Sequence, residues 1–112
     1  MVWNRACDYD FEPTLVGDKL LKASVQFDAL VNNGGLGHTI HVAEPIEVQD
    51  ALTGLRRFGL DDAARVVETA LGLNDEDAQE AMTDEYHDAV QSLDAAFEEY
   101  YSSHIEEFAP PG

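Results

Sequence analysis

The chain has 112 residues, the length of one ordinary domain, and its 23 acidic and 6 basic residues give a formal net charge of −17. Because 45% of the residues are hydrophobic, the chain has enough apolar side chains for a core and is not predicted to be disordered. Direct binding to DNA or RNA is nearly excluded, and binding to anionic membranes is disfavoured, because both depend on cationic contacts to phosphate. The charge favours a basic protein as the partner.

The apolar pattern predicts an all-α protein, a compact single domain of five to six helices with a long acidic C-terminal helix, since no stretch alternates with the period of a strand. Residues 1–13 are expected to be irregular, residues 14–108 to form the helical domain and residues 109–112 to be a tail. Helices are predicted over 15–33, 36–42, 45–58, 62–72, 75–82 and 84–107. Glycine accepts the backbone geometry that ends a helix, so a structural turn is assigned to Asn32, Asn33, Gly34 and Gly35.

The predicted last helix has an apolar side and an acidic side. Its apolar stripe recurs every three or four residues and is expected to lie in the core; it consists of Tyr86, Val90, Leu93, Phe97, Tyr100 or Tyr101, and His104. The acidic residues near the opposite side are Asp84, Asp88, Glu98, Glu99 and Glu106. A solvated helix normally interleaves basic residues with acidic ones, and this helix has none, so its like charges repel without relief.

Charge is also divided unevenly along the chain. Residues 1–65 hold 10 acidic and all 6 basic residues, a net charge of −4, whereas residues 66–112 hold 13 acidic residues and no basic one, a net charge of −13. The cost of such repulsion suggests that the negative field itself is used. We therefore expect a partner-binding surface made of Asp75, Glu76, Asp77, Glu80, Asp84, Asp88, Glu98, Glu99 and Glu106.

Motifs for metal binding and catalysis are weak. His38 and His41 would share a helical face, but the sequence fixes no third metal ligand. Residues 8–12 place acids at alternate positions, but Pro13 stands where a calcium-binding loop needs glycine. A nucleophile elbow, a phosphate-binding loop and a Cys-X-X-Cys pair are all missing. We expect no enzyme, cofactor or metal; an enzyme with its site at His38 and His41 is the minor alternative.

Three absences predict a cytoplasmic protein. The single cysteine, Cys7, cannot form an internal disulfide, so the chain needs no oxidising compartment. The first residues lack the apolar stretch of a secretory signal, and no run of 18 apolar residues could cross a membrane.

The segment 25–36, which reads Val-Gln-Phe-Asp-Ala-Leu-Val-Asn-Asn-Gly-Gly-Leu, resembles the helix–turn element of the bacterial DNA-mimic (DMP-type) domain family. The similarity continues through an amphipathic helix ending near Phe58, an alanine-rich helix with Leu71 near its end and a long helix ending near Phe108. It covers roughly residues 14–108. The resemblance implies an all-helical, dimeric protein with a DNA-like negative surface that occupies the DNA-binding face of a helix-turn-helix regulator.

The residues and the resemblance together predict an acidic DNA mimic that binds the DNA-binding face of a basic protein and blocks its access to DNA. Two alternatives stay open: an immunity or anti-restriction inhibitor of a basic nuclease, and a halophilic protein with no mimic role, since Lys19 and Lys22 are the only lysines. A homodimer is expected, through the apolar stripe of the last helix or through the N-terminal segment with Trp3, Tyr9 and Phe11.

Overall fold

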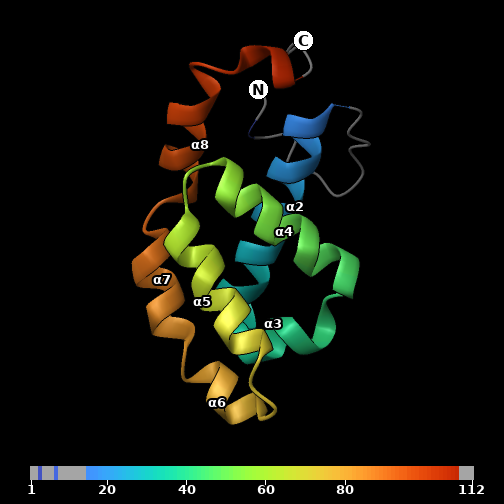
Figure 1. Cartoon of the computed structure of the whole chain (residues 1–112), viewed down its shortest axis with the longest axis vertical. Helices are drawn as coiled ribbons and strands as arrows, with labels where there is room; N and C mark the ends of the chain where they lie inside the picture. Colours follow the sequence, from blue (N-terminus) through green and yellow to red (C-terminus); the bar gives the residue numbers. More distant parts are fainter. Residues whose placement is uncertain (1–2, 4–6, 8–14, 109–112) are drawn as a thin grey trace.

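The computed structural model describes residues 3, 7 and 15–108 of the chain (Figure 1). These residues form α-helices joined by short turns and include no strand, which confirms the predicted all-α class. The calcium-like run at 8–12, the aromatic residues Tyr9 and Phe11 and the tail at 109–112 lie outside the described residues.

The helices follow one another with turns of only a few residues. In chain order they are α2 (Val16–Gly34), α3 (Leu36–Val42), α4 (Pro45–Arg57), α5 (Asp61–Leu71), α6 (Glu76–Glu80), α7 (Thr83–Val90) and α8 (Leu93–Tyr101), followed by the 3-10 helix η1 (Ile105–Glu107). The bounds of α2 to α5 lie within one residue of those that the sequence predicts.

Local signals explain this agreement. Helix α4 begins with proline at its first position, where the missing N–H costs nothing. The side chain of Glu47 accepts a hydrogen bond from the backbone N–H of Glu44 at 2.8 Å, as part of a capping box. After α4 the chain turns at Gly59, whose φ of 81° lies in the region that glycine occupies without strain.

The prediction of one long helix over 84–107 is wrong, because this part of the chain forms three shorter helices, α7, α8 and η1. The break falls at Gln91, a non-glycine residue with φ 55° and ψ −80°. Ser92 then caps α8 by accepting a hydrogen bond from the backbone N–H of Ala95. Val90 and Leu93 both stay buried across the break, which is why the apolar spacing reads as one helix.

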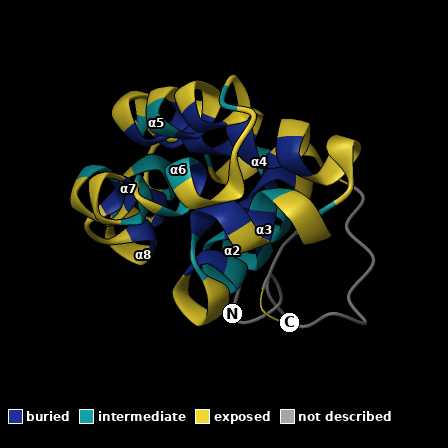
Figure 2. Ribbon diagram, turned by 90° about the horizontal axis from the view of Figure 1, so that it is seen from below, coloured by how far each residue is buried: buried dark blue, intermediate teal, exposed yellow. Residues whose placement is uncertain are grey.

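The core lies between α2, α4, α5 and α7, with α2 packed against α4 and α5 packed against α7 (Figures 1 and 2). Four residues of the predicted apolar stripe, Tyr86, Val90, Leu93 and Phe97, are buried, which confirms that this part of the stripe belongs to the core. Tyr100, Tyr101 and His104, at the end of the stripe, are partly exposed. A second cluster, made of Leu21, Phe58, Phe97 and Phe108, joins α8 to the N-terminal end of α2. Trp3 packs against Phe97, with ring centroids 5.9 Å apart.

Candidate functional site

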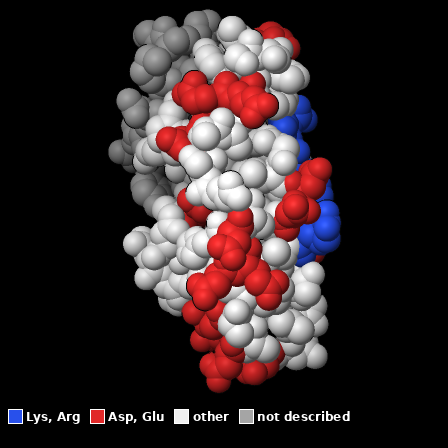
Figure 3. Space-filling view, turned by 90° about the vertical axis from the view of Figure 1, so that its left-hand side faces the viewer, with Lys and Arg blue, Asp and Glu red and all other residues white. Residues whose placement is uncertain are grey.

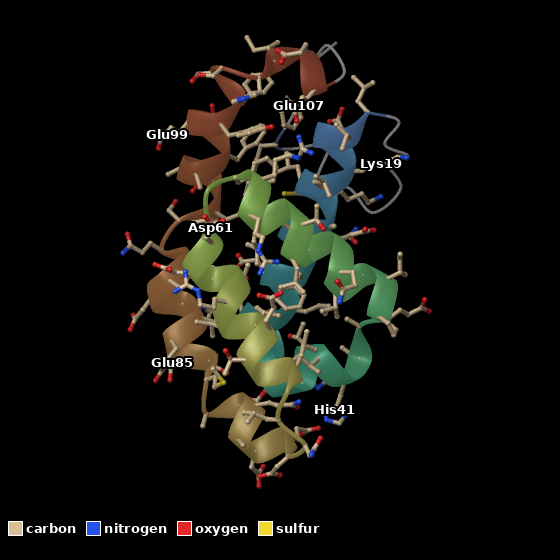
Figure 4. The ribbon with its side chains drawn as sticks, in the orientation of Figure 1. Lys19, His41, Asp61, Glu85, Glu99 and Glu107 are labelled. Atoms are coloured by element: carbon tan, nitrogen blue, oxygen red, sulfur yellow. The ribbon has the colours of Figure 1, made fainter. Side chains whose placement is uncertain are left out.

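Helices α6, α7 and α8 follow one another along one side of the protein (Figure 1). Seen from that side, acidic side chains form a band running the length of the molecule, and Lys and Arg are confined to its edge (Figure 3). Glu85 and Glu99 point outward from this side (Figure 4). The exposed acidic residues of these helices, of their caps and of η1 are Asp75, Glu76, Asp77, Asp84, Glu85, Asp88, Asp94, Glu98, Glu99 and Glu106. We call this set the acidic surface.

Most of the α7, α8 and η1 carboxylates have no partner to neutralise them. Among the described residues, no hydrogen bond or ion pair engages the carboxylates of Asp84, Glu85, Asp88, Glu98, Glu99 and Glu106. Asp94 differs, because its carboxylate accepts a hydrogen bond from the backbone N–H of Ala95 at 2.9 Å and so helps to cap α8.

Two of the described arginines, Arg56 of α4 and Arg65 of α5, pair with acids of α5. Arg56 bonds to Glu68, and Arg65 Nη2 lies 2.9 Å from Asp62 Oδ1. Both pairs join exposed side chains of α4 and α5, where an ion pair contributes only about 0.2–1 kcal/mol. The two pairs offset two of the three acidic residues of α5. Among the described residues, no ion pair offsets the exposed carboxylates of α7 and α8.

Glu80, which the sequence assigned to the partner-binding surface, is partly buried and makes a contact within the protein. Its Oε1 accepts a hydrogen bond from the backbone N–H of His38 at 2.8 Å, and Thr83 Oγ1 accepts one from the backbone N–H of Leu36 at 3.0 Å. These amides belong to the first turn of α3, where the helix supplies no acceptor and its dipole favours an anion. Glu80 therefore fastens α6 to the start of α3.

The turn between α2 and α3 contains the predicted Asn-Asn-Gly-Gly segment. Gly34 is the last residue of α2, and Gly35 follows with φ 88° and ψ 168°, a conformation that essentially only glycine adopts. A side chain on Gly35 would overlap the carboxylate of Glu80. Asn32 donates a hydrogen bond from Nδ2 to Oδ2 of Asp28, one turn earlier, and Asn33 is exposed.

Tyr86 joins α7 to α2 through its hydroxyl group. The Tyr86 hydroxyl donates a hydrogen bond to Oδ1 of Asp28 at 2.9 Å, and its ring meets that of Phe27 edge-on with centroids 6.0 Å apart. Burial, and then the negative charge of Asp28, raise the pKa of Tyr86 far above its usual value. The sequence places Tyr86 on the apolar stripe but gives no sign of the carboxylate 58 positions earlier that its hydroxyl meets.

A third tie holds α8 and η1 against α4. Glu107 accepts hydrogen bonds from Arg57 Nη1 at 2.8 Å and from the Tyr100 hydroxyl at 2.6 Å. Burial, and then the hydrogen bond to Glu107, raise the pKa of Tyr100. The ring of His104 stacks on that of Tyr100 with centroids 4.0 Å apart. Glu107 is therefore occupied inside the protomer, unlike its neighbour Glu106.

The two histidines considered as metal ligands lie at the surface. His41 Nε2 is 3.3 Å from Oε1 of Glu76, and both side chains are about half exposed, at 56% and 55%. His38 is exposed, and its ring lies next to Gly34. In the part of the chain that the structure describes, no three His, Cys, Asp or Glu residues group as metal ligands do.

The fold and the acidic surface define an all-helical protein whose exposed carboxylates are concentrated on its last three helices. The sequence model for the DMP19-like protein family matches residues 17–109, and the chain belongs to this family. The match confirms the resemblance noted at Asn-Asn-Gly-Gly and covers nearly the same residues. No curated protein and no solved structure matches the chain. Over the described residues, every helix is too short or too polar to span a bilayer.

Proposed function

We propose that the protein is a DNA mimic: it binds the DNA-binding face of a basic protein, such as a helix-turn-helix regulator, and blocks that protein's access to DNA. The observation that carries the proposal is the band of six carboxylates on α7, α8 and η1 that no cation of the described chain neutralises. In this proposal the protein acts by binding rather than by catalysis.

The spacing of these carboxylates supports the proposal. Asp84 and Asp88 are four residues apart on α7, and Glu85 and Asp88 are three apart. Side chains at these separations on a helix lie about 5–6 Å from each other, the same order as successive phosphates along a DNA strand. A row of carboxylates therefore offers Lys and Arg side chains what a phosphate backbone offers, without bases to read.

The rigidity of the acidic surface supports it as well. Glu80 ties α6 to α3, Tyr86 ties α7 to Asp28 of α2, and Glu107 ties η1 to Arg57 of α4. Groups that are held in place before binding lose less conformational entropy when a partner arrives. These three contacts hold in place the helices that carry the carboxylates, so binding to a cationic surface orders side chains but does not have to order the helices.

The experiment removes charge from the acidic surface without changing its shape. The test variant carries Asp84→Asn, Asp88→Asn, Glu98→Gln and Glu99→Gln, four exposed positions with no partner to lose among the described residues. The parent is used to capture a partner from a lysate of the source cells, and a salt gradient releases it. We expect the affinity of the captured protein for the test variant to be lower by about tenfold or more, which is about 1.4 kcal/mol, with a shallower dependence on salt.

A matched control changes the net charge by the same four units elsewhere. It carries Gln49→Lys, Asp50→Asn, Thr53→Lys and Asp61→Asn, all at exposed positions of α4 and α5 outside the ion pairs of these helices. The control should bind as the parent does, and DNA should compete with the parent for the captured protein. Equal losses in both variants would contradict the proposal, because bulk charge and not the acidic surface would then set the affinity.

Two other outcomes of this experiment would favour the two alternative functions, a nuclease inhibitor and a halophilic protein. A captured nuclease, inhibited by the parent and released by the test variant, would identify an immunity or anti-restriction inhibitor that uses the same surface. A parent that captures nothing and unfolds at low salt would identify a halophilic protein. The paired arginines of α4 and α5 disfavour this last outcome, because halophilic adaptation would spread unpaired acids over every exposed face.

A further inference from the structure

A pocket with a volume of about 500 Å³ lies where α8 meets the turn between α4 and α5. The last residue of α4, the turn after it and the second half of α8 line this pocket. Phe58, Leu60 and Ala96 give it an apolar part, and Glu99, a member of the acidic surface, and His104 give it a polar part. A concave site of this size with a few polar groups is typical of a binding site for a small ligand or a side chain.

The charges around this pocket favour a cation as its occupant. Among the described residues, no hydrogen bond or ion pair engages the carboxylate of Glu99. Helices α4 and α8 both end beside the pocket, and the C-terminus of a helix carries a partial negative charge. Arg57 also lines the pocket, but its Nη1 donates a hydrogen bond to Glu107 at 2.8 Å, so its positive charge is offset within the protein.

The pocket also contains a flat aromatic surface. The ring of His104 is stacked on the ring of Tyr100, with centroids 4.0 Å apart and an angle of 4° between their planes. Its Nδ1 donates a hydrogen bond to the backbone oxygen of Tyr100 at 2.9 Å, which fixes the orientation of the ring. His104 is partly exposed, and among the described rings only that of Tyr100 contacts it. A planar guanidinium stacks on such a ring, whereas the ammonium group of lysine has no flat face, so the pocket favours arginine over lysine.

We infer that this pocket binds an arginine side chain of the partner protein, with the guanidinium between the carboxylate of Glu99 and the ring of His104. The inference rests on the proposed function and adds to it a site where the shape of one side chain is recognised. Exposed carboxylates attract any basic protein, whereas a pocket selects a partner that presents an arginine at the matching position. Arginines that enter a pocket of this kind are among the residues that contribute most to binding at interfaces.

A titration with a single blocked amino acid tests the pocket without the partner. The probe is Nα-acetyl-arginine amide, added to the full chain and followed by NMR. We expect saturable shifts of the backbone amide signals of Leu60 and Ser103 and of the ring signals of His104, with Kd in the millimolar range that a single small ligand reaches. Nα-acetyl-citrulline amide keeps the shape but has no charge, and should bind at least about tenfold more weakly. Nα-acetyl-lysine amide should bind at least about threefold more weakly.

Three variants locate the bound probe. Ala96→Leu fills the pocket without changing the charge, and Glu99→Gln removes the carboxylate; each should weaken binding of the arginine probe by at least about fivefold. Ala95→Leu places the same side chain at the neighbouring exposed position of α8, outside the pocket, and should leave binding of the probe unchanged. Circular dichroism checks that each variant is folded. Should Ala96→Leu fail to fold, Ser103→Leu fills the same pocket from an exposed position.

The outcomes separate this inference from the proposed function. No saturable shift up to about 20 mM, equal binding of the arginine and lysine probes, or full binding to a folded pocket-filling variant would each overturn the inference. Against the captured partner, Ala96→Leu should lower the affinity by at least about tenfold with an unchanged dependence on salt, because no charge is removed. An unchanged affinity would overturn the inference and leave the acidic surface as the binding site. If the arginine probe binds as expected but no partner is captured, the proposed function fails and the arginine site stands.

Discussion

Replacing Gly35 by alanine should destabilise the protein much more than replacing its neighbour Gly34. Gly35 has φ 88° and ψ 168°, where a residue with a side chain is strained by about 1–3 kcal/mol. The added methyl group would also displace the Glu80 carboxylate that accepts the hydrogen bond from His38. Losing a cap costs about 1 kcal/mol, so the free energy of unfolding should fall by about 2–4 kcal/mol.

Gly34 is different because it has helical geometry at the end of α2. Alanine is favoured over glycine in a helix by up to about 1 kcal/mol. Its methyl group would meet only the ring of His38, an exposed side chain that can turn away. The two effects roughly cancel, so Gly34→Ala should change the free energy of unfolding by less than about 1 kcal/mol.

Thermal and urea denaturation of the two variants measure this difference. At roughly 4 °C per kcal/mol for a chain of this length, Gly35→Ala should lower Tm by about 8–16 °C and Gly34→Ala by less than about 4 °C. Part of the loss should vanish when Glu80→Ala is already present, because the displaced carboxylate is then gone. Equal Tm values for the two variants, or no coupling between Gly35 and Glu80, would refute the reasoning.

Two further changes probe the break in the acidic helices and the tie between α7 and α2. Gln91→Gly should raise the free energy of unfolding by about 0.5–1 kcal/mol in a urea titration, because glycine adopts a positive φ without strain. Tyr86→Phe should lower it by about 1–3 kcal/mol, since half-buried Asp28 loses the hydroxyl that donates to its Oδ1. Folding raises the pKa of Tyr86, so above pH 10, near the pKa of tyrosine in the unfolded chain, the free energy of unfolding of the parent should fall by about 1.4 kcal/mol per pH unit. The free energy of unfolding of Tyr86→Phe, measured by alkaline denaturation, should fall less over the same range.

The helix bounds could be predicted because local residues set them. Pro45, Gly35 and Gly59 act through their own backbone geometry, and each lies at a helix boundary in the structure. The break at Gln91 could not be predicted for the same reason, since glutamine carries no signal for a positive φ. The buried residues on each side of it keep a helical spacing, so the pattern hides the interruption.

The exposure of most acidic residues on the last helices could be predicted from the sequence, whereas their contacts could not. The exposed residues of α7 and α8 follow from the phase of the apolar stripe, but Glu85 was not assigned and Glu80 was. Glu80 is held by the backbone of His38, 42 positions earlier in the chain. Such long-range partners decide whether a carboxylate is free to bind another protein, and no local pattern contains them.

The Asn-Asn-Gly-Gly turn and the helices that carry the acidic surface are linked by hydrogen bonds. The turn places the amides of α3 under Glu80, and Asn32 bonds to the same Asp28 carboxylate that receives the hydroxyl of Tyr86. The residues that carry the family resemblance therefore help to position the acidic helices. A change in the turn should lower stability and binding together, whereas a change on the acidic surface should lower binding alone. Measuring stability and binding on the same variants therefore distinguishes residues that hold the acidic helices in place from carboxylates that bind the partner.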